Sequence, residues 1–393
     1  MKKEKIVILA PFPIYPPDNA GANRIFSLSM ELSKYYDVVN YSQCVNRSMI
    51  WKKLSGKPSF AKVIVNNYYK IIQSYNPIYN FFLFLTSRIN AQNFLASTAL
   101  NLHQDKVLMN EIQGASLLQV EHPWQYDWAK KISEKYNIPL VLSIHNIESN
   151  ILKDAIPAFP LKKLLINYLF QKENRSYKIA KNIIYLSENE KRYFEDTCDD
   201  KKNSCIIPMW PDNRLFSIER LFTNKNKIIN IFFVGSNWMP NIIAMRFIEK
   251  LAEKNINNRK LIFLIAGSVG QGRKKSKNII YTGKLKSLMP IYEKADIFIN
   301  PMSIGSGVNF KVIEAMAASL PIITTPFGAR GIKLKNNING IIADLSEFNN
   351  VLNQLANNKE LRIKIGKAAR VTALKYYQRK NVIDNIKRFY NEL

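Results

Sequence analysis

The hydrophobic residues of this chain occur in two series of short apolar runs, and a segment with helical spacing follows most of them. Runs such as Ile231–Val234 and Leu261–Ile265 are apolar at every position, which is typical of strands covered by helices on both faces. Strands that alternate with helices predict parallel sheets. The pattern therefore predicts an α/β protein with two doubly wound parallel-sheet domains.

Twelve strands are expected from these runs. Those of the first half are Lys5–Ala10, Asp37–Tyr41, Leu117–Glu121, Pro139–Ile144, Asn182–Leu186 and Ser204–Ile207. Those of the second half are Ile228–Val234, Lys260–Ala266, Asn278–Thr282, Asp296–Asn300, Pro321–Thr325 and Gly340–Ala343.

The two halves are separated by Pro208–Asp212 and a polar Lys/Asn stretch that ends near Lys227. We therefore expect one domain over residues 1–212, a second over residues 213–376, and a final helix over residues 377–393. One face of that helix is apolar and needs a surface to cover it. Its members are Val382, Ile383, Ile386, Phe389, Tyr390 and Leu393.

The chain is strongly basic, with 57 Lys and Arg against 30 Asp and Glu and a net charge of +27. Such a field attracts phosphates, anionic lipid or nucleic acid. A compositional bias towards Asn, Ile and Lys is the alternative explanation. Because no zinc-finger spacing, basic-zipper heptad or aromatic RNA-binding run is present, an anionic membrane surface is favoured over nucleic acid.

Two segments have the character of membrane-binding surfaces. The stretch Trp51–Asn90 mixes lysines with aromatic residues and fits neither predicted sheet. It is expected either to lie on an anionic membrane or amphiphilic acceptor, or to cover the first sheet. The second segment has an apolar helical face flanked by Lys162, Lys163 and Lys172. That face consists of Leu161, Leu164, Leu165, Tyr168 and Leu169.

The three cysteines fit no metal-binding spacing, and an odd number cannot pair fully, so a reducing compartment is expected. The first apolar run, Ile6–Ala10, is too short for a signal peptide. No run approaches the ~20 apolar residues that a membrane-spanning helix needs. We therefore expect a cytoplasmic protein, or one attached to the inner face of the membrane.

The loop after Asn300 is the strongest candidate for chemistry, because ligands of open parallel sheets bind beyond the carboxyl ends of strands. Its glycines would let the backbone approach a ligand, and the helix that follows would offer free amides to a phosphate. Lys311 adds a positive charge, and Glu314 could accept hydrogen bonds from ribose hydroxyls. The alternative for Glu314 is a capping or salt-bridged residue. The predicted donor-binding residues here are Gly305, Ser306, Gly307, Val308, Asn309, Lys311 and Glu314.

In the first half, His145 directly follows a predicted strand and is a candidate for catalysis, with a structural role as the alternative. Gly21 follows the proline-rich loop after the first strand and could let an amide meet a diphosphate. No second carboxylate suited to the reacting sugar is apparent. No Asp-x-Asp occurs in the chain, so neither a metal nor any other cofactor is expected.

Together these residues form a family pattern. The segments Phe233–Asn241, Asp296–Pro301, Gly307–Ala318 and Pro321–Thr325 resemble the glycosyl transferases of group 1, also called glycosyltransferase family 4. The first half agrees in the loop to Gly21 with Arg24, the His145-Asn146 loop, and Ser187 after a strand. The resemblance implies the GT-B fold, in which two Rossmann-like domains face each other across a cleft and the last helix returns to the first domain.

The resemblance also implies roles. The second domain would hold a nucleotide-sugar donor and the first an acceptor, with retention of anomeric configuration and without metal. Glu314 would bind the ribose, His145 would lie near the donor sugar, and Gly21 near the diphosphate. Arg24 is placed on the acceptor side.

Two departures from the family pattern affect the donor site. Ser306 stands where the family has the first of its paired glutamates, which touches the donor sugar. Ser236 and Asn237 stand where it has Arg and Lys, which leaves phosphate binding to Lys311.

The sequence thus predicts a retaining glycosyltransferase that moves a sugar from a nucleotide sugar to a cell-envelope glycan or lipid-linked acceptor, as in polysaccharide or lipopolysaccharide biosynthesis. Two alternatives remain open. One is a GT-B-like sugar-nucleotide epimerase, which the missing glutamate and the three histidines of the chain disfavour. The other is a non-enzymatic basic protein that binds membranes or nucleic acid.

Overall fold

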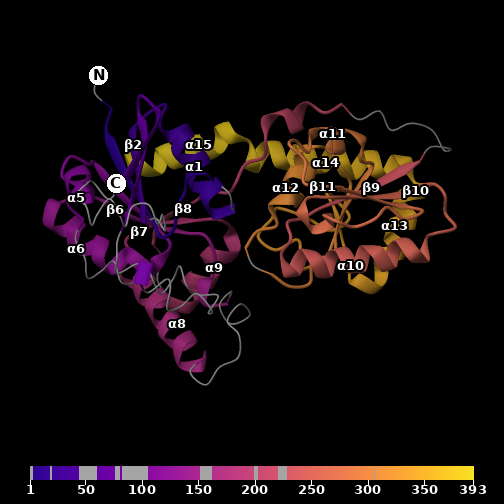
Figure 1. Ribbon diagram of the computed structural model, residues 1–393, viewed down its shortest axis with the longest axis horizontal. Helices are drawn as coiled ribbons and strands as arrows, with labels where there is room; N and C mark the ends of the chain where they lie inside the picture. Colours follow the sequence, from indigo (N-terminus) through magenta and orange to yellow (C-terminus); the bar gives the residue numbers. More distant parts are fainter. Residues whose placement is uncertain are drawn as a thin grey trace. The chain divides into compact units, whose positions relative to one another are not determined.

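The computed structural model describes residues 3–17, 20–43, 60–75, 80–81, 105–150, 162–198, 202–219, 228–305 and 307–393. The chain divides into two compact units (Figure 1). The first comprises Met1–Ile207 together with Asn385–Leu393, and the second comprises Pro208–Asp384.

The first unit is built on an eight-stranded sheet with the order β3-β4-β2-β1-β5-β6-β7-β8. All neighbouring pairs are parallel except β3 and β4. Each strand predicted in this half is present. The strands are β1 (Lys5–Ala10), β2 (Asp37–Gln43), β3 (Phe60–Asn66), β4 (Tyr69–Ser74), β5 (Leu117–Glu121), β6 (Leu140–Ile144), β7 (Asn182–Tyr185) and β8 (Asn203–Ile206).

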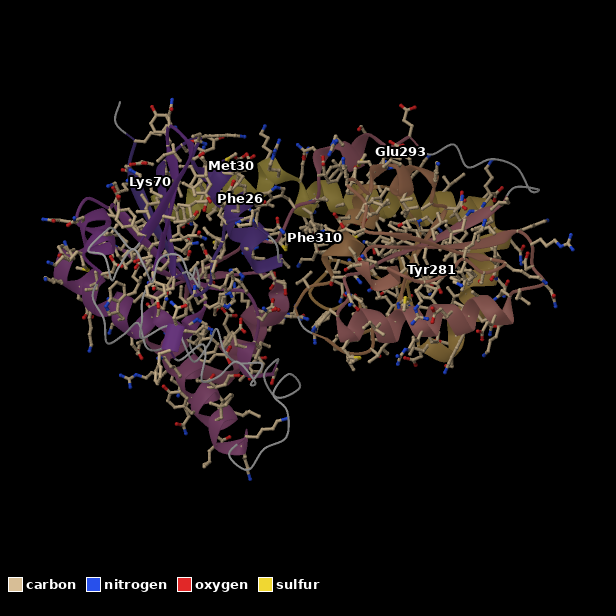
Figure 2. The ribbon with its side chains drawn as sticks, viewed as in Figure 1. Phe26, Met30, Lys70, Tyr281, Glu293 and Phe310 are labelled. Atoms are coloured by element: carbon tan, nitrogen blue, oxygen red, sulfur yellow. The ribbon has the colours of Figure 1, made fainter. Side chains whose placement is uncertain are left out.

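The prediction that residues 51–90 fit neither sheet is wrong for the residues described there. The strands β3 and β4 form an antiparallel hairpin at the sheet edge, and β4 pairs with β2. The Asn66 side chain accepts a hydrogen bond from the Tyr68 amide (2.8 Å) and so closes the turn without the glycine that marks most hairpins. Met30 and Phe26 project from helix α1 (Ala20–Leu32) (Figure 2), and the Phe26 ring lies 5.7 Å from that of Tyr69. The remaining predicted residues, 51–59, 76–79 and 82–90, lie outside the described part.

Helices cover the apolar residues of the first sheet. The helices α5, α6, α8 and α9 contribute to one hydrophobic cluster with alternate residues of the central strands, such as Leu118 and Val120 of β5. The helices are α5 (Lys106–Ile112), α6 (Tyr126–Tyr136), α8 (Lys162–Ile179), α9 (Glu188–Cys198) and α15 (Arg379–Asn391). Near the end of α15, Tyr390 packs edge-on against Tyr36 with a centroid distance of 5.9 Å.

The second unit has a six-stranded parallel sheet with the order β11-β10-β9-β12-β13-β14. Here too, each predicted strand is present. The strands are β9 (Ile229–Val234), β10 (Leu261–Ala266), β11 (Ile279–Gly283), β12 (Ile297–Asn300), β13 (Ile322–Thr324) and β14 (Ile341–Ile342).

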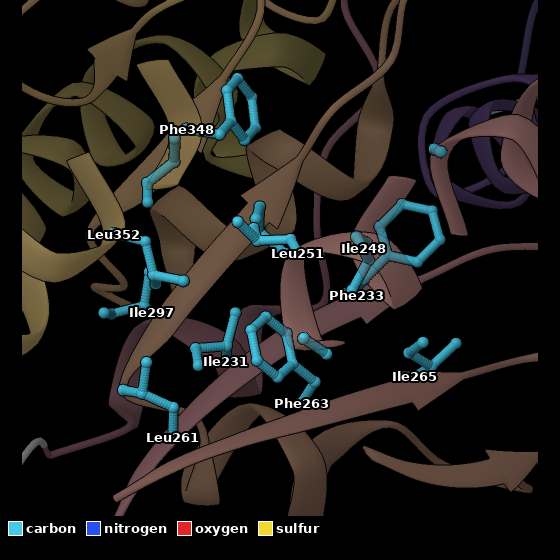
Figure 3. Close-up of a cluster of buried hydrophobic side chains, with 14 of the residues drawn as sticks. Ile231, Phe233, Ile248, Leu251, Leu261, Phe263, Ile265, Ile297, Phe348 and Leu352 are labelled. Carbon is cyan, nitrogen blue, oxygen red and sulfur yellow. The ribbon is translucent and has the colours of Figure 1, made fainter. Parts of the chain in front are cut away.

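Both faces of the second sheet are buried. Ile231 and Phe233 of β9 pack with helices α10 and α13 (Figure 3), whereas Phe232 between them packs on the opposite face with α11, α12 and α14. This alternation is the two-residue period of a strand, and it explains why every position is apolar. The helices are α10 (Met239–Lys254), α11 (Met289–Lys294), α12 (Phe310–Ala317), α13 (Phe348–Asn357) and α14 (Lys359–Tyr377).

The order of strands reverses direction once in each sheet, between β1 and β5 in the first and between β9 and β12 in the second. Neighbouring loops at such a point leave on opposite faces and open a crevice beyond the carboxyl ends of the strands. The two switch points therefore locate a candidate site in each unit.

No helix in the described part of the chain has the length and apolar character required to cross a bilayer.

Close packing between α14 and the segment after α12 generates the first prediction. A Cβ added to Gly366 in α14 would lie 2.3 Å from the Ser319 carbonyl oxygen. Glycine to alanine inside a helix normally stabilises a protein by about 1 kcal/mol. We expect Gly366→Ala instead to destabilise the unit by about 1–3 kcal/mol, because the backbone must move. Val371→Ala, at a position 66% exposed on the same helix, is the control and should change little. Urea denaturation of both variants provides the measurement, and equal stability of the two would contradict the prediction.

Candidate active-site residues

The donor-site loop of the second unit leaves the sheet after β12, at the switch point. Gly305 and Gly307 have φ angles of 128° and 64°, in the region that favours glycine. Val308 and Asn309 lead into α12, and the Asn309 side chain makes no capping hydrogen bond. Ser306 lies outside the described residues. The loop thus has the glycine geometry that a close backbone approach to a ligand requires.

The Lys311 side chain points from the first turn of α12 towards the first turn of α10 rather than towards solvent. Its Nζ donates to Asn241 Oδ1 (2.8 Å) and lies 4.5 Å from the centre of the Phe233 ring. Burial lowers the pKa of Lys311 to about 7. The ammonium is therefore held at the ends of β9 and β12, where an anionic ligand would restore its charge.

Glu314 lies one turn along the same helix. One of its oxygens accepts a hydrogen bond from the Tyr292 hydroxyl (3.0 Å), and burial raises the pKa of the carboxyl to about 7. Among the salt bridges of the described residues, none involves Glu314. A half-buried carboxyl with one neutral donor retains capacity for further hydrogen bonds, as binding of a ribose would need.

The loop after β9 carries Ser236 and Asn237 in place of the basic residues of the family. Asn241 Nδ2 donates to both the carbonyl oxygen and the hydroxyl of Ser236 (3.1 and 3.2 Å), and the Asn237 amide donates to Ser268 Oγ (2.9 Å). A Cβ on Gly267 would lie 2.2 Å from the Gly235 carbonyl oxygen, so the loops after β9 and β10 touch through their backbones.

A second cation reaches the glycine loop and was missed in the sequence. Arg330, after β13, donates from Nη2 to the Gly307 carbonyl oxygen (3.3 Å), and its guanidinium lies 4.3 Å from the Phe327 ring centre. A strand end followed by Phe327-Gly-Ala-Arg330 was the available signal, because loops after neighbouring parallel strands meet at one sheet edge.

The candidate residues of the first unit gather at the carboxyl ends of β5 and β6. His145 Nε2 lies 2.5 Å from Glu121 Oε2, and both side chains are buried. The His122 ring lies 4.3 Å from the His145 ring, and its Nδ1 is 2.7 Å from Glu148 Oε1. His122 also has a φ of 70°, a conformation that non-glycine residues adopt at a cost.

Burial is the main reason that His145 is expected to be neutral. Burial, together with the nearby His122, lowers the pKa of His145 to about 4, despite the opposing effect of Glu121. Burial alone would raise the pKa of Glu121, but its contacts with His145 and the charge of Arg24 hold it at about 2. At neutral pH we therefore expect a carboxylate paired with a neutral imidazole.

The residues predicted around the first loop lie on α1. Gly21 is the second residue of that helix and is half-buried. Arg24 is only 5% exposed, and its Nε and Nη2 atoms lack hydrogen-bond partners among the described residues. Its charge acts on the buried Glu121 and Glu190, so it lies in the interior of the unit.

Of the residues gathered here, the sequence singles out His145 as a candidate but not Glu121, His122 or Glu148. Glu121 and Gln119 are polar residues at alternate positions of a strand that is buried throughout, and this alternation was the available signal. The sequence reveals no second carboxylate near the candidate residues, whereas the structure places Glu121 and Glu148 beside the two histidines.

The titration of Glu314 yields a prediction about stability. Its pKa rises from 4.5 to about 7 on folding, so its contribution to stability is present at low pH and is lost as the pH rises through about 7. Glu314→Gln imitates the neutral carboxyl. It should therefore raise the melting temperature at pH 8, by the equivalent of about 2–3 kcal/mol, and change it little at pH 5. Glu293→Gln, an exposed glutamate (Figure 2), is the control and should show no such pH dependence. An equal effect at both pH values would disprove the assigned titration.

Comparison with known proteins agrees with this geometry. Residues 229–358 match the family described as glycosyl transferases group 1. An uncharacterized 44.6 kDa protein in the cps region of Klebsiella pneumoniae is 24% identical over 372 residues, covering 86% of this chain and 87% of the relative.

Among solved structures, sucrose-phosphate synthase of Thermosynechococcus elongatus superposes with a TM-score of 0.66 at 13% identity, covering 99% of each chain. Anabaena HepE in complex with UDP gives a TM-score of 0.66 at 11% identity, covering 99% of this chain and 100% of the other. At such identities the structures establish the fold, and the match over residues 229–358 supplies the activity class. The chain is therefore a glycosyltransferase with the GT-B fold, and its second unit carries the group 1 sequence.

Proposed function

We propose that the protein transfers a sugar from a nucleoside-diphosphate sugar to a cell-envelope glycan or lipid-linked acceptor, with retention of anomeric configuration. The observation that carries the proposal is the arrangement at the start of α12. A glycine loop, the cation of Lys311 and the carboxyl of Glu314 meet at the switch point of the second sheet. The relative from a cps region and the HepE structure with UDP-glucose support the acceptor and donor classes. The glycosyltransferase match sets aside the epimerase and the non-enzymatic alternatives.

The chemistry follows from the charges. The bond between the anomeric carbon and the diphosphate oxygen breaks, a bond to the acceptor oxygen forms, and the acceptor proton passes to the departing diphosphate. Lys311, Arg330 and the loop amides stabilise the negative charge that develops on the diphosphate. Glu314 binds the ribose, and His145, as a neutral imidazole, accepts a hydrogen bond from a sugar hydroxyl. No metal and no covalent nucleophile take part in this scheme.

We propose that the protein acts at the cytoplasmic surface of an anionic membrane and contacts it through helix α8. Leu164 and Tyr168, one turn apart on α8, are 66% and 49% exposed, and Lys163 is exposed beside them. Leu169, which was assigned to the same face, is fully buried, and that part of the prediction is wrong because Leu169 points into the unit. Leu161 lies outside the described residues. Exposed apolar side chains next to lysines suit the interface of an anionic bilayer.

Calorimetric titration with UDP and uridine tests the donor site. Hydrogen bonds to charged groups contribute about 1.5–3 kcal/mol. Glu314→Ala should therefore weaken UDP binding by roughly ten- to a hundredfold, and Glu314→Gln by less. Lys311→Ala should weaken UDP binding but leave uridine binding nearly unchanged, because only UDP carries the diphosphate. The affinities should be the same in excess EDTA and in Mg²⁺.

Glu293→Ala, which removes an exposed glutamate from the same unit, is the matched control and should bind UDP normally. Each variant is first checked for a normal melting curve. Wild-type affinity in Glu314→Ala would show that α12 does not hold the donor. Binding that requires Mg²⁺ would overturn the metal-free scheme.

Flotation with liposomes tests the membrane contact. We expect binding to vesicles that contain anionic lipid, weakening as salt screens the lysines, and little binding to neutral vesicles. The double variant Leu164→Ser/Tyr168→Ser should reduce flotation several-fold. The control Ile338→Ser/Val371→Ser removes apolar side chains that are 56% and 66% exposed in the second unit. Equal flotation of the two double variants would remove α8 from the proposal.

A further inference from the structure

A chain of buried hydrogen bonds joins the C-terminal helix to His145. The Tyr390 hydroxyl lies 2.5 Å from Gln119 Oε1, Gln119 Nε2 lies 2.5 Å from Glu121 Oε1, and Glu121 Oε2 lies 2.5 Å from His145 Nε2. These four residues come from β5, the end of β6 and α15, and all belong to the first unit.

Burial of these polar groups in the core is energetically costly. Gln119 and Glu121 are 0% and 1% exposed on a strand whose other side chains, Leu117, Leu118 and Val120, form apolar core. Burying an amide and a carboxylate is unfavourable unless each is fully hydrogen-bonded. Apolar residues at both positions would serve a purely structural strand at least as well, so the pair points to a role beyond packing.

The direction of each hydrogen bond is set by the chemistry of its partners. Glu121 as a carboxylate only accepts, so Gln119 must present its NH₂ group to Glu121 and its carbonyl oxygen to Tyr390. The Tyr390 hydroxyl then donates, and it holds the amide in this orientation. The second oxygen of Glu121 must likewise accept a hydrogen bond, which His145 donates from Nε2–H. In a neutral imidazole, the other nitrogen, Nδ1, is then left with its lone pair.

The charged and titratable groups around the pair favour the same state. Arg24 lies in the interior of the unit, and its charge stabilises the Glu121 carboxylate. His122, with its ring 4.3 Å from that of His145, opposes a positive charge on His145. Two more carboxylates lie near these groups. Glu190 is hydrogen-bonded to Ser187, and Glu148 is hydrogen-bonded to His122.

We propose that Gln119 and Tyr390 are positioning residues which, through Glu121, hold His145 in the tautomer protonated on Nε2, so that Nδ1 accepts a hydrogen bond from a substrate hydroxyl. The proposal rests on the proposed function, in which His145 contacts the sugar. It gives the last residues of the chain a role in catalysis as well as in packing, and it makes His145 an acceptor rather than a cationic stabiliser of the diphosphate.

Substitutions along the chain of hydrogen bonds test the positioning role. Tyr390→Phe keeps the ring packed against Tyr36 but frees the Gln119 amide to turn. We expect UDP release from UDP-glucose to slow by about ten- to a hundredfold, as for other residues that orient a ligating or catalytic group. The affinity for UDP, bound by the second unit, should stay unchanged. The control is Tyr177→Phe, which removes a buried hydroxyl bonded to Tyr185 (2.8 Å) in the same unit. It should cost similar stability without slowing turnover.

The tautomer is observed directly from the ¹⁵N chemical shifts of the histidine rings, with the His145 signals assigned by their loss in His145→Ala. The wild type should show a neutral ring protonated on Nε2. In Glu121→Gln, Gln119 still donates to the new amide oxygen, so the new NH₂ group faces His145 and the ring must switch its proton to Nδ1. This nearly isosteric variant should therefore be about as inactive as His145→Ala, because its histidine is the wrong tautomer.

The possible results distinguish a failure of the positioning role from a failure of the proposed function. A wild-type ring protonated on Nδ1, or turnover in Tyr390→Phe equal to that in Tyr177→Phe while His145→Ala is inactive, would overturn this inference alone. Full turnover in His145→Ala would overturn it together with the role of His145 in the proposed function. Loss of UDP binding in Glu314→Ala bears only on the donor site, so that part of the proposed function is tested independently.

Discussion

Burial of both faces of a parallel sheet is the constraint on which the rest of this structure depends. The backbone groups of such a sheet are hydrogen-bonded within the sheet, so only side chains contact the helices on its two faces. The side chains on both faces of each strand are therefore apolar. Ile231, Phe232 and Phe233 satisfy this by alternating between the two hydrophobic clusters of the second unit. Ligands therefore bind to the loops at the carboxyl ends of the strands rather than to the strands themselves.

The two candidate sites meet this constraint in different ways. In the second unit, glycines at positive φ and the start of α12 offer backbone to a ligand, and two cations reach the same loop. In the first unit, polar side chains enter the sheet itself, and β5 carries Gln119 and Glu121 inside the core. The cost of burying them is met by a continuous series of hydrogen bonds that ends at His145.

Burial also decides the ionisation of the candidate groups. The pKa values of Lys311 and Glu314 both move to about 7, because each side chain loses water without gaining a full ion-pair partner. The pKa of Glu121 is lowered despite burial, because the carboxylate is bonded to His145 and lies near the charge of Arg24. The ionisation of Lys311 and Glu314 can thus change when a diphosphate binds. In contrast, Glu121 stays a carboxylate and His145 stays a neutral imidazole.

The sequence by itself determined the strands, the fold class and the glycine loop before α12, because a two-residue period, fully apolar runs and glycine positions are local properties of the chain. It also placed His145 directly after a strand, since that position is visible without knowing the neighbours of the residue. The edge hairpin β3–β4 escaped prediction because a side chain of Asn66, rather than a glycine, closes its turn. The tertiary structure alone decided which residues meet: Arg330 at Gly307, His122 beside His145, and Tyr390 on Gln119 across 271 positions of sequence. Such pairs depend on the order of strands in the sheet and on the return of the last helix, and neither leaves a periodic signal in the sequence.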